Sequence, residues 1–170
     1  MDSAKSLENY PIWIVLVSNT VSLALYLSGL YIMSEINILV AGIYFLYILV
    51  LEFRLLAGHC VNCYYYGRTC GFGKGRLSSL FFKKGDPAKF CEKQMTWKEM
   101  IPDLMVSLGP FISGVVLLIL DFNILLLAVL LLLVILTTSG NATVRGKLVC
   151  RFCRQREMGC PAEALFNKTN

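Results

Sequence analysis

The residues with the clearest chemical potential in this chain are its cysteines, because six of them follow one repeated spacing. Cys60 and Cys63 form a CxxC motif, and Cys70 follows after six residues. The same spacing recurs at a constant offset of 90 residues in Cys150, Cys153 and Cys160. Thiolates spaced in this way are typical ligands of tetrahedral zinc sites and of iron–sulfur clusters.

Two ligand schemes fit these cysteines. In the first, the two CxxC pairs form a single four-thiolate site, which zinc accepts. In the second, each half holds its own centre through three cysteines, and Cys91 and His59 supply the remaining ligands. The second scheme is preferred because it uses all seven cysteines and the single histidine. Arginines near the motifs would offset the negative charge of either centre: Arg68, Arg151, Arg154 and Arg156.

The composition is that of a membrane protein. Of the 170 residues, 56% are hydrophobic, and the mean hydropathy of +0.64 is too high for an ordinary soluble domain. Four mostly apolar runs are long enough to cross a bilayer as helices. They cover Ile12 to about Met33, Ile38 to Leu56, Ile101 to Leu120, and Phe122 to about Thr138.

Polar residues mark the turns between these runs. The last two runs nearly fuse, but one helix from Leu104 to Leu136 would be roughly 50 Å long, whereas a hydrocarbon core is about 30 Å thick. Asp121 and Asn123 therefore mark a hairpin, and Glu35 and Asn37 mark the equivalent turn in the first half.

The apolar segments share the repeat of the cysteines. Residues 21–29 align with residues 106–114 at an offset of 85, and Glu35 aligns with Asp121 at an offset of 86. The predicted fold is therefore an all-α membrane protein, with four transmembrane helices arranged as two parallel two-helix repeats. Each repeat precedes a cytoplasmic CxxCx6C module, so the segments are 1–57, 58–98, 99–143 and 144–170.

The basic residues predict the orientation. Of the sixteen Lys and Arg residues, Lys5 precedes the first span, nine lie in residues 54–98 and six lie in residues 145–168. By the positive-inside rule, both termini and the central loop are cytoplasmic. We expect a multi-pass protein of the cell membrane.

Some single residues in and near the spans carry weaker signals. Ser28-Gly29 and Ser113-Gly114 either mark a helix packing interface or reflect the frequency of small residues in membrane helices. Tyr10 and Trp13 suit the headgroup boundary as anchors. Glu52 lies near enough to the membrane boundary to be interfacial.

The central loop carries the features of a lipid contact. Its cations interleave with large apolar residues, a mixture that suits a segment lying on anionic lipid headgroups rather than on nucleic acid. These residues are Lys74, Arg76, Leu77, Leu80, Phe81, Phe82, Lys83 and Lys84. Glycines from Gly71 to Gly75 are expected to fold the chain tightly around Cys70. Cys91 is expected in a helix that Asp86-Pro87 begins, and Cys160 is expected to cap a short helix beginning at Pro161.

The function most consistent with these patterns is a membrane protein that holds one or two thiolate metal centres, with iron–sulfur or zinc undecided. Iron–sulfur would permit electron transfer to a membrane or redox partner, whereas zinc would stabilise a scaffold or sensor. Four spans with a CxxC motif also resemble the quinone-linked thiol oxidoreductases of the vitamin K epoxide reductase and DsbB types. In those families the chemistry faces the oxidising side, whereas these cysteines are expected in the cytoplasm, so this alternative ranks second and an enzyme is not favoured.

Overall fold

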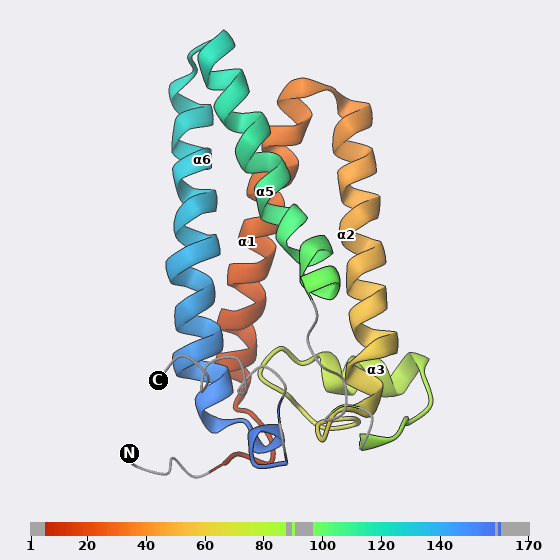
Figure 1. The fold of residues 1–170 in the computed structure, drawn as a ribbon. Coiled ribbons are helices and arrows are strands. Elements are labelled where there is room, and N and C mark those ends of the chain that lie inside the picture. The colour runs from red at the N-terminus through yellow and green to blue at the C-terminus, as the bar shows by residue number, and fades with distance from the viewer. Residues whose placement is uncertain (1–5, 88–89, 91–96, 159, 161–170) are drawn as a thin grey trace. The chain divides into compact units, whose positions relative to one another are not determined.

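The computed structural model describes residues 6–87, 90, 97–158 and 160, and this part of the chain is helical without a β-strand. The helices are α1 (Ile12–Ile36), α2 (Ile38–Gly58), α3 (Lys74–Phe81), α5 (Trp97–Leu120) and α6 (Ile124–Ile135), as Figure 1 shows. Short 3₁₀ turns follow at Cys60–Asn62, Cys150–Phe152 and Arg154–Arg156.

Four helical segments within the described residues are long and apolar enough to cross a membrane. They are Ile12–Ile36, Ile38–Asn62, Met100–Leu120 and Ile124–Phe152. The predicted number of membrane helices is therefore confirmed. Four such helices identify a membrane protein and are compatible with a chain that crosses the bilayer several times.

The fourth span is longer than predicted. Beyond Ile135, α6 continues with π-helical geometry through residues 136–140 and 142–149. The polar stretch 137–143 is therefore helical, and the Thr138 hydroxyl donates to the Val134 carbonyl of the preceding turn at 2.7 Å. The candidate spans Ile38–Asn62 and Ile124–Phe152 consequently include Cys60 and Cys150 near their ends.

Both predicted hairpin turns occur, and each is built by an asparagine. The Asn37 side chain accepts a hydrogen bond from the Leu39 N–H at 2.8 Å, and Asn123 accepts from Leu125 at 2.9 Å. This is helix N-capping, which satisfies an amide that has no partner within its own helix. The same cap thus begins α2 and α6.

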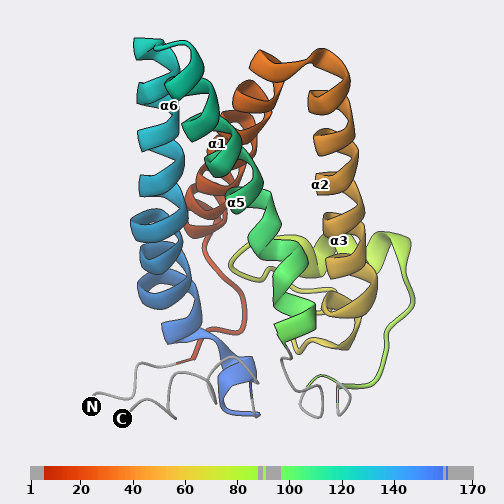
Figure 2. The ribbon, with the colours of Figure 1, turned by 45° about the horizontal axis from the view of Figure 1, so that its top comes forward.

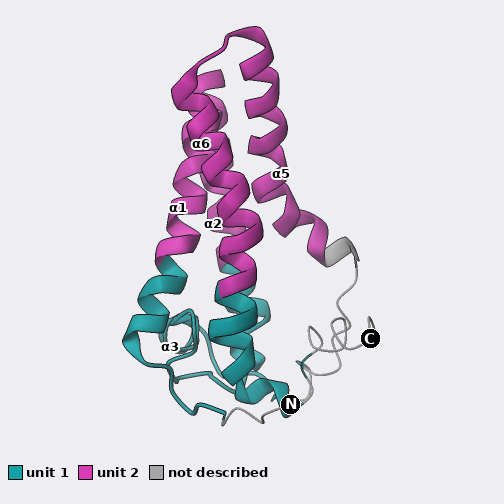
Figure 3. Ribbon diagram, turned by 90° about the vertical axis from the view of Figure 1, so that its left-hand side faces the viewer, with its two compact units in different colours: residues 1–19, 53–96, 144–170 teal, residues 20–52, 97–143 magenta. Residues whose placement is uncertain are grey.

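The described chain divides into two compact units (Figure 3). Unit 1 comprises residues 1–19, 53–96 and 144–170, and unit 2 comprises residues 20–52 and 97–143. All six described cysteines belong to unit 1. Unit 2 contains most of the helical hairpins.

Within unit 2, the α1–α2 and α5–α6 hairpins stand beside each other with their turns at the same end (Figures 1 and 2). One buried cluster joins α1, α2 and α5 through Leu25, Met33, Ala41, Tyr44, Ile48 and Val106. A second joins α1 to α6 through Ile32, Leu126, Leu130 and Leu133.

Two tyrosine hydroxyls of α2 bond to backbone carbonyls of α5, and one of these carbonyls lacks its helical donor because of a proline. Pro110 has no N–H, so the carbonyl of Val106 lacks its usual helical donor. The Tyr44 hydroxyl of α2 donates to that carbonyl at 2.8 Å, and Tyr47 donates to the Pro102 carbonyl at 2.8 Å. An unsatisfied carbonyl inside a bilayer would cost several kcal/mol, so these contacts hold α2 against α5.

The two corresponding glycines lie at close helix contacts. A Cβ atom on Gly29 would press on the Tyr44 hydroxyl and lie 2.9 Å from its Cζ, and a Cβ on Gly114 would lie 2.9 Å from Leu130. A Cβ on Gly42, by contrast, would meet nothing within 4 Å. Close packing therefore explains Gly29 and Gly114 better than composition does.

We predict that Gly29→Ala destabilises the folded protein by about 1–3 kcal/mol, because the new methyl group displaces the Tyr44 hydroxyl from its buried bond. The matched control, Gly42→Ala, should be neutral or stabilising because alanine is the better helix former. Thermal unfolding in detergent would measure both variants. Equal stability of the two variants would contradict the packing described for Gly29.

Candidate metal centre

The two CxxC motifs have the same local backbone. Each forms a 3₁₀ turn in which the second cysteine donates its N–H to the carbonyl of the first. The donor–acceptor distance is 3.4 Å from Cys63 to Cys60 and 3.3 Å from Cys153 to Cys150. Both turns directly follow a long helix, which places the motifs in equivalent positions along the chain.

Cys70 is held by the glycine turn that the sequence predicted. Gly73 adopts a φ of 71°, a conformation that side chains disfavour, and it precedes the first residue of α3. The Gly75 N–H then donates to the Cys70 sulfur at 3.4 Å. This bond fixes the position of the Cys70 sulfur beside the start of α3.

Thiols of the two motifs interact across the motifs as well as within them. The Cys63 thiol lies close enough to Cys70 and Cys160 for their charges to interact. Cys153 is similarly coupled to Cys63, Cys150 and Cys160. Five thiols of the two motifs therefore lie near one another in unit 1.

Burial keeps the central thiols protonated in the metal-free protein. Desolvation raises the pKa of Cys63 to about 11 and that of Cys153 to about 12, and neighbouring thiols add to the increase. Backbone N–H groups, led by those of Tyr65 and Gln155 respectively, oppose the shift. A metal ion would displace these protons on binding.

The predicted ligands are not arranged as a coordination sphere. Among the described residues, no three His, Cys, Asp or Glu side chains are placed to hold a metal ion. The six described cysteines are free thiols. His59 precedes the Cys60–Asn62 turn, whereas Cys91 and the helix expected from Pro161 lie outside the described residues.

The N-terminal segment, residues 6–10, binds both cysteine modules. Leu7 donates its N–H to the Phe152 carbonyl at 3.0 Å, and Tyr10 donates its N–H to the Thr69 carbonyl at 2.9 Å. The Tyr10 hydroxyl donates to the Val149 carbonyl at 2.7 Å. Tyr10 is only 4% exposed, so its predicted role as a headgroup anchor is wrong, because these bonds draw it into the interior of unit 1.

Tyr65 is the central connection between the modules. Its hydroxyl donates to the Leu7 carbonyl and accepts from the Arg154 N–H at 3.0 Å, and the side chain is 1% exposed. Beside it, the Tyr64 N–H donates to the buried Gln155 side chain at 2.8 Å. Sequence reasoning missed these roles; the aromatic run between Cys63 and Cys70 was the available signal.

The arginines divide between two tasks. Arg154 pairs with Glu8 at 2.6 Å and lies over the Tyr64 ring, and Arg68 lies over the same ring. The positive charges that act on Cys150 come from Arg145 and Arg156. Of the four arginines predicted to offset thiolate charge, Arg156 lies where it favours the charged form of a thiol. Arg145 has the same effect and was not among the predicted residues.

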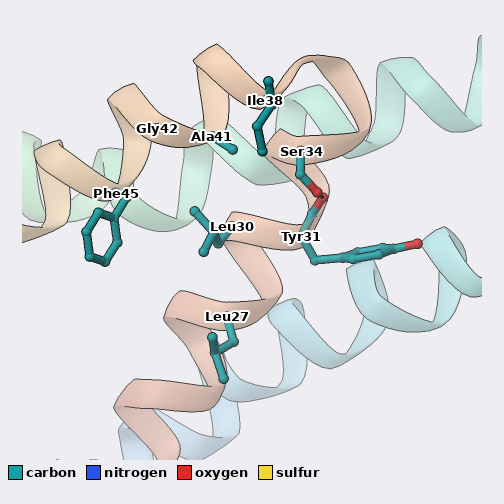
Figure 4. Close-up of a pocket in the computed structure, with 8 residues that line it drawn as sticks. All are labelled: Leu27, Leu30, Tyr31, Ser34, Ile38, Ala41, Gly42 and Phe45. Carbon is teal, nitrogen blue, oxygen red and sulfur yellow. Dashed lines mark hydrogen bonds between the residues drawn. The ribbon is translucent and has the colours of Figure 1, made fainter.

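An apolar groove of about 500 Å³ lies in unit 2 (Figure 4). It is lined from α1 and α2 by Leu27, Leu30, Tyr31, Ser34, Ile38, Ala41, Gly42 and Phe45. No cysteine lines it. The groove therefore lends no support to a quinone site coupled to the thiols.

Comparison with known proteins finds no matching family model, no matching curated protein and no matching solved structure. The site is therefore interpreted from its own chemistry.

We predict that Tyr65→Phe destabilises unit 1 by about 1–3 kcal/mol, because two partly buried backbone groups lose their partner. Limited proteolysis should then cleave residues 6–10 faster. Tyr64→Phe is the matched control, since the bond that its hydroxyl accepts comes from the exposed Arg68 side chain; it should behave like wild type. Unchanged proteolysis of Tyr65→Phe would show that the hydroxyl does not hold the N-terminal segment.

Proposed function

We propose that this protein is a multi-pass membrane protein whose two CxxCx6C motifs share one thiolate metal centre at the cytoplasmic face. Cys63, Cys153 and Cys160 would supply three ligands, and either Cys70 or Cys150 would complete the set; metal binding would have to draw these thiols together, since they are not already placed to hold an ion. The observation that supports the proposal is the proximity of Cys63 to Cys153 and Cys160, because it brings together thiols of different motifs.

This proposal replaces the two-centre scheme preferred from the sequence. Two independent centres need no contact between the motifs. The motifs nevertheless contact each other through Tyr65, through the N-terminal segment and through Gly71, where an added Cβ would lie 2.6 Å from a Val149 methyl group. A shared centre uses that proximity.

The matching local structures also support a duplicated architecture. The two CxxC turns share one hydrogen-bond pattern, and Asn37 and Asn123 cap their helices in the same way. We propose two-helix repeats related by a pseudo-twofold axis along the membrane normal. The one-sided basic residues place both termini in the cytoplasm of this arrangement.

The identity of the metal decides the role of the centre. Zinc would join the N-terminal segment, the central loop and the C-terminal residues as a structural tie, as it does in small metal-dependent folds. An iron–sulfur cluster in the same thiolates would permit electron transfer to a partner at the membrane. Arg145 and Arg156 would offset part of the thiolate charge in either case.

We predict that anaerobically purified protein carries one centre per chain, and that either Cys63→Ser or Cys153→Ser abolishes it. Elemental analysis for zinc and iron measures the content, and visible absorption that dithionite bleaches identifies iron–sulfur. Arg151→Ser, an exposed residue of the same turn as Cys153, should retain the metal. Loss of only half of the metal in each cysteine variant would indicate two independent centres, and metal-free protein with a Cys63–Cys153 disulfide would favour the oxidoreductase.

We also predict that Gly71→Ala lowers the metal content without altering any cysteine. The added methyl group would push against the stiff, branched side chain of Val149 and separate the two motifs. Gly146→Ala is the matched control because its Cβ would meet nothing within 4 Å. Wild-type metal content and stability in Gly71→Ala would contradict a centre shared between the motifs.

A further inference from the structure

The short helix α3 is built with its polar side inward. Ser78 is fully buried and Gly75 is also buried, whereas Leu77, Leu80 and Phe81 are 43%, 76% and 71% exposed. A helix on the surface of a soluble protein has the opposite arrangement, with its apolar side facing the core.

Contacts on both sides of α3 fix this orientation. The Ser78 hydroxyl donates to the Leu56 carbonyl at 3.3 Å, which attaches the helix to the last turns of α2. Gly75 packs so tightly that a Cβ would lie 2.8 Å from the Arg68 carbonyl. After α3, the Tyr66 hydroxyl donates to the Phe82 carbonyl at 2.7 Å. The apolar residues therefore cannot turn inward without breaking these contacts.

The attachment point places α3 at the membrane boundary. At 1.5 Å per residue, about 20 residues of helix cross a hydrocarbon core of about 30 Å. Counted from Ile38, where α2 begins, that distance ends close to Leu56. Phe53, one turn earlier and 62% exposed, packs edge-on against Phe82 at 5.3 Å between ring centroids. An exposed side chain of α2 is thus in contact with the residue that directly follows α3.

Cations surround the exposed apolar residues. Arg76, Lys83 and Lys84 are exposed, and Lys74 begins the helix. Positive charge beside apolar side chains suits the headgroup region of an anionic leaflet, where each Lys or Arg near the surface strengthens binding about fivefold. A neutral protein surface would offer no partner for these charges.

We propose that α3 is an interfacial helix that inserts Leu77, Leu80 and Phe81 among the acyl chains of anionic lipids. Lys74, Arg76, Lys83 and Lys84 contact the headgroups. The helix thereby seats the cysteine-bearing unit against the bilayer independently of any metal.

Photo-crosslinking of the full chain tests this proposal. A diazirine amino acid replaces Leu80, and the protein is reconstituted in bilayers of phosphatidylcholine with or without phosphatidylserine. Illumination should yield lipid adducts, whereas the same probe at the exposed Glu157 should yield few. Adduct levels at residue 80 equal to those at residue 157, or crosslinks from residue 80 to a second copy of the chain, would overturn the proposal.

Charge variants test the lipid preference separately. Lys83→Gln with Lys84→Gln should reduce the preference for phosphatidylserine at residue 80 by about fivefold for each charge removed. Lys147→Gln with Arg151→Gln changes the net charge equally, elsewhere in unit 1, and should leave the preference unchanged. An equal loss in both pairs would show that net charge, and not α3, attracts the lipid. Because neither readout depends on metal, the result does not depend on the proposed centre.

Discussion

A carbonyl group without a donor is what a helix in a bilayer tolerates least, and α5 contains one because Pro110 cannot supply the N–H that Val106 needs. The Tyr44 hydroxyl provides that donor, and the small Gly29 leaves room for its ring. One proline, one tyrosine and one glycine from three helices thus form a single arrangement in unit 2. The same principle recurs in unit 1, where Tyr65 and Tyr10 bond to backbone carbonyls.

The parts of the fold that follow from local patterns were predictable. Hydropathy predicts four spans because burial in lipid requires long apolar helices, and Asn37 and Asn123 predict the turns because their side chains cap the next helix. The continuation of α6 beyond Thr138 was not predictable from hydropathy, because the residues that follow Thr138 are polar and yet helical. The tyrosine contacts join residues far apart in the chain, and no periodic pattern records such partners.

The sequence predicted which cysteines belong to the candidate site. It did not predict which of these cysteines lie next to each other. A repeated spacing identifies Cys60, Cys63, Cys70 and their counterparts as one set of thiols. Which thiols approach each other depends also on the N-terminal segment, which folds through long-range bonds. The coupling of Cys160 with Cys63, ninety-seven positions apart in the numbering, therefore emerges only in three dimensions. The role of Arg154 was unpredictable for the same reason, because its ion-pair partner, Glu8, is far from it in the sequence.

The attachment of residues 6–10 to the C-terminal motif constrains how the protein is made. Tyr10 and its acceptor at Val149 are separated by 139 positions, and Glu8 and Arg154 by 146. A ribosome releases the first of each pair long before it synthesises the second. The helical hairpins can insert as they emerge, whereas the N-terminal segment must wait, unpaired, until the last motif is translated. Completion of unit 1 is therefore a late event in biogenesis, and during that interval the thiols of the first motif are open to chaperones, metal carriers and oxidants.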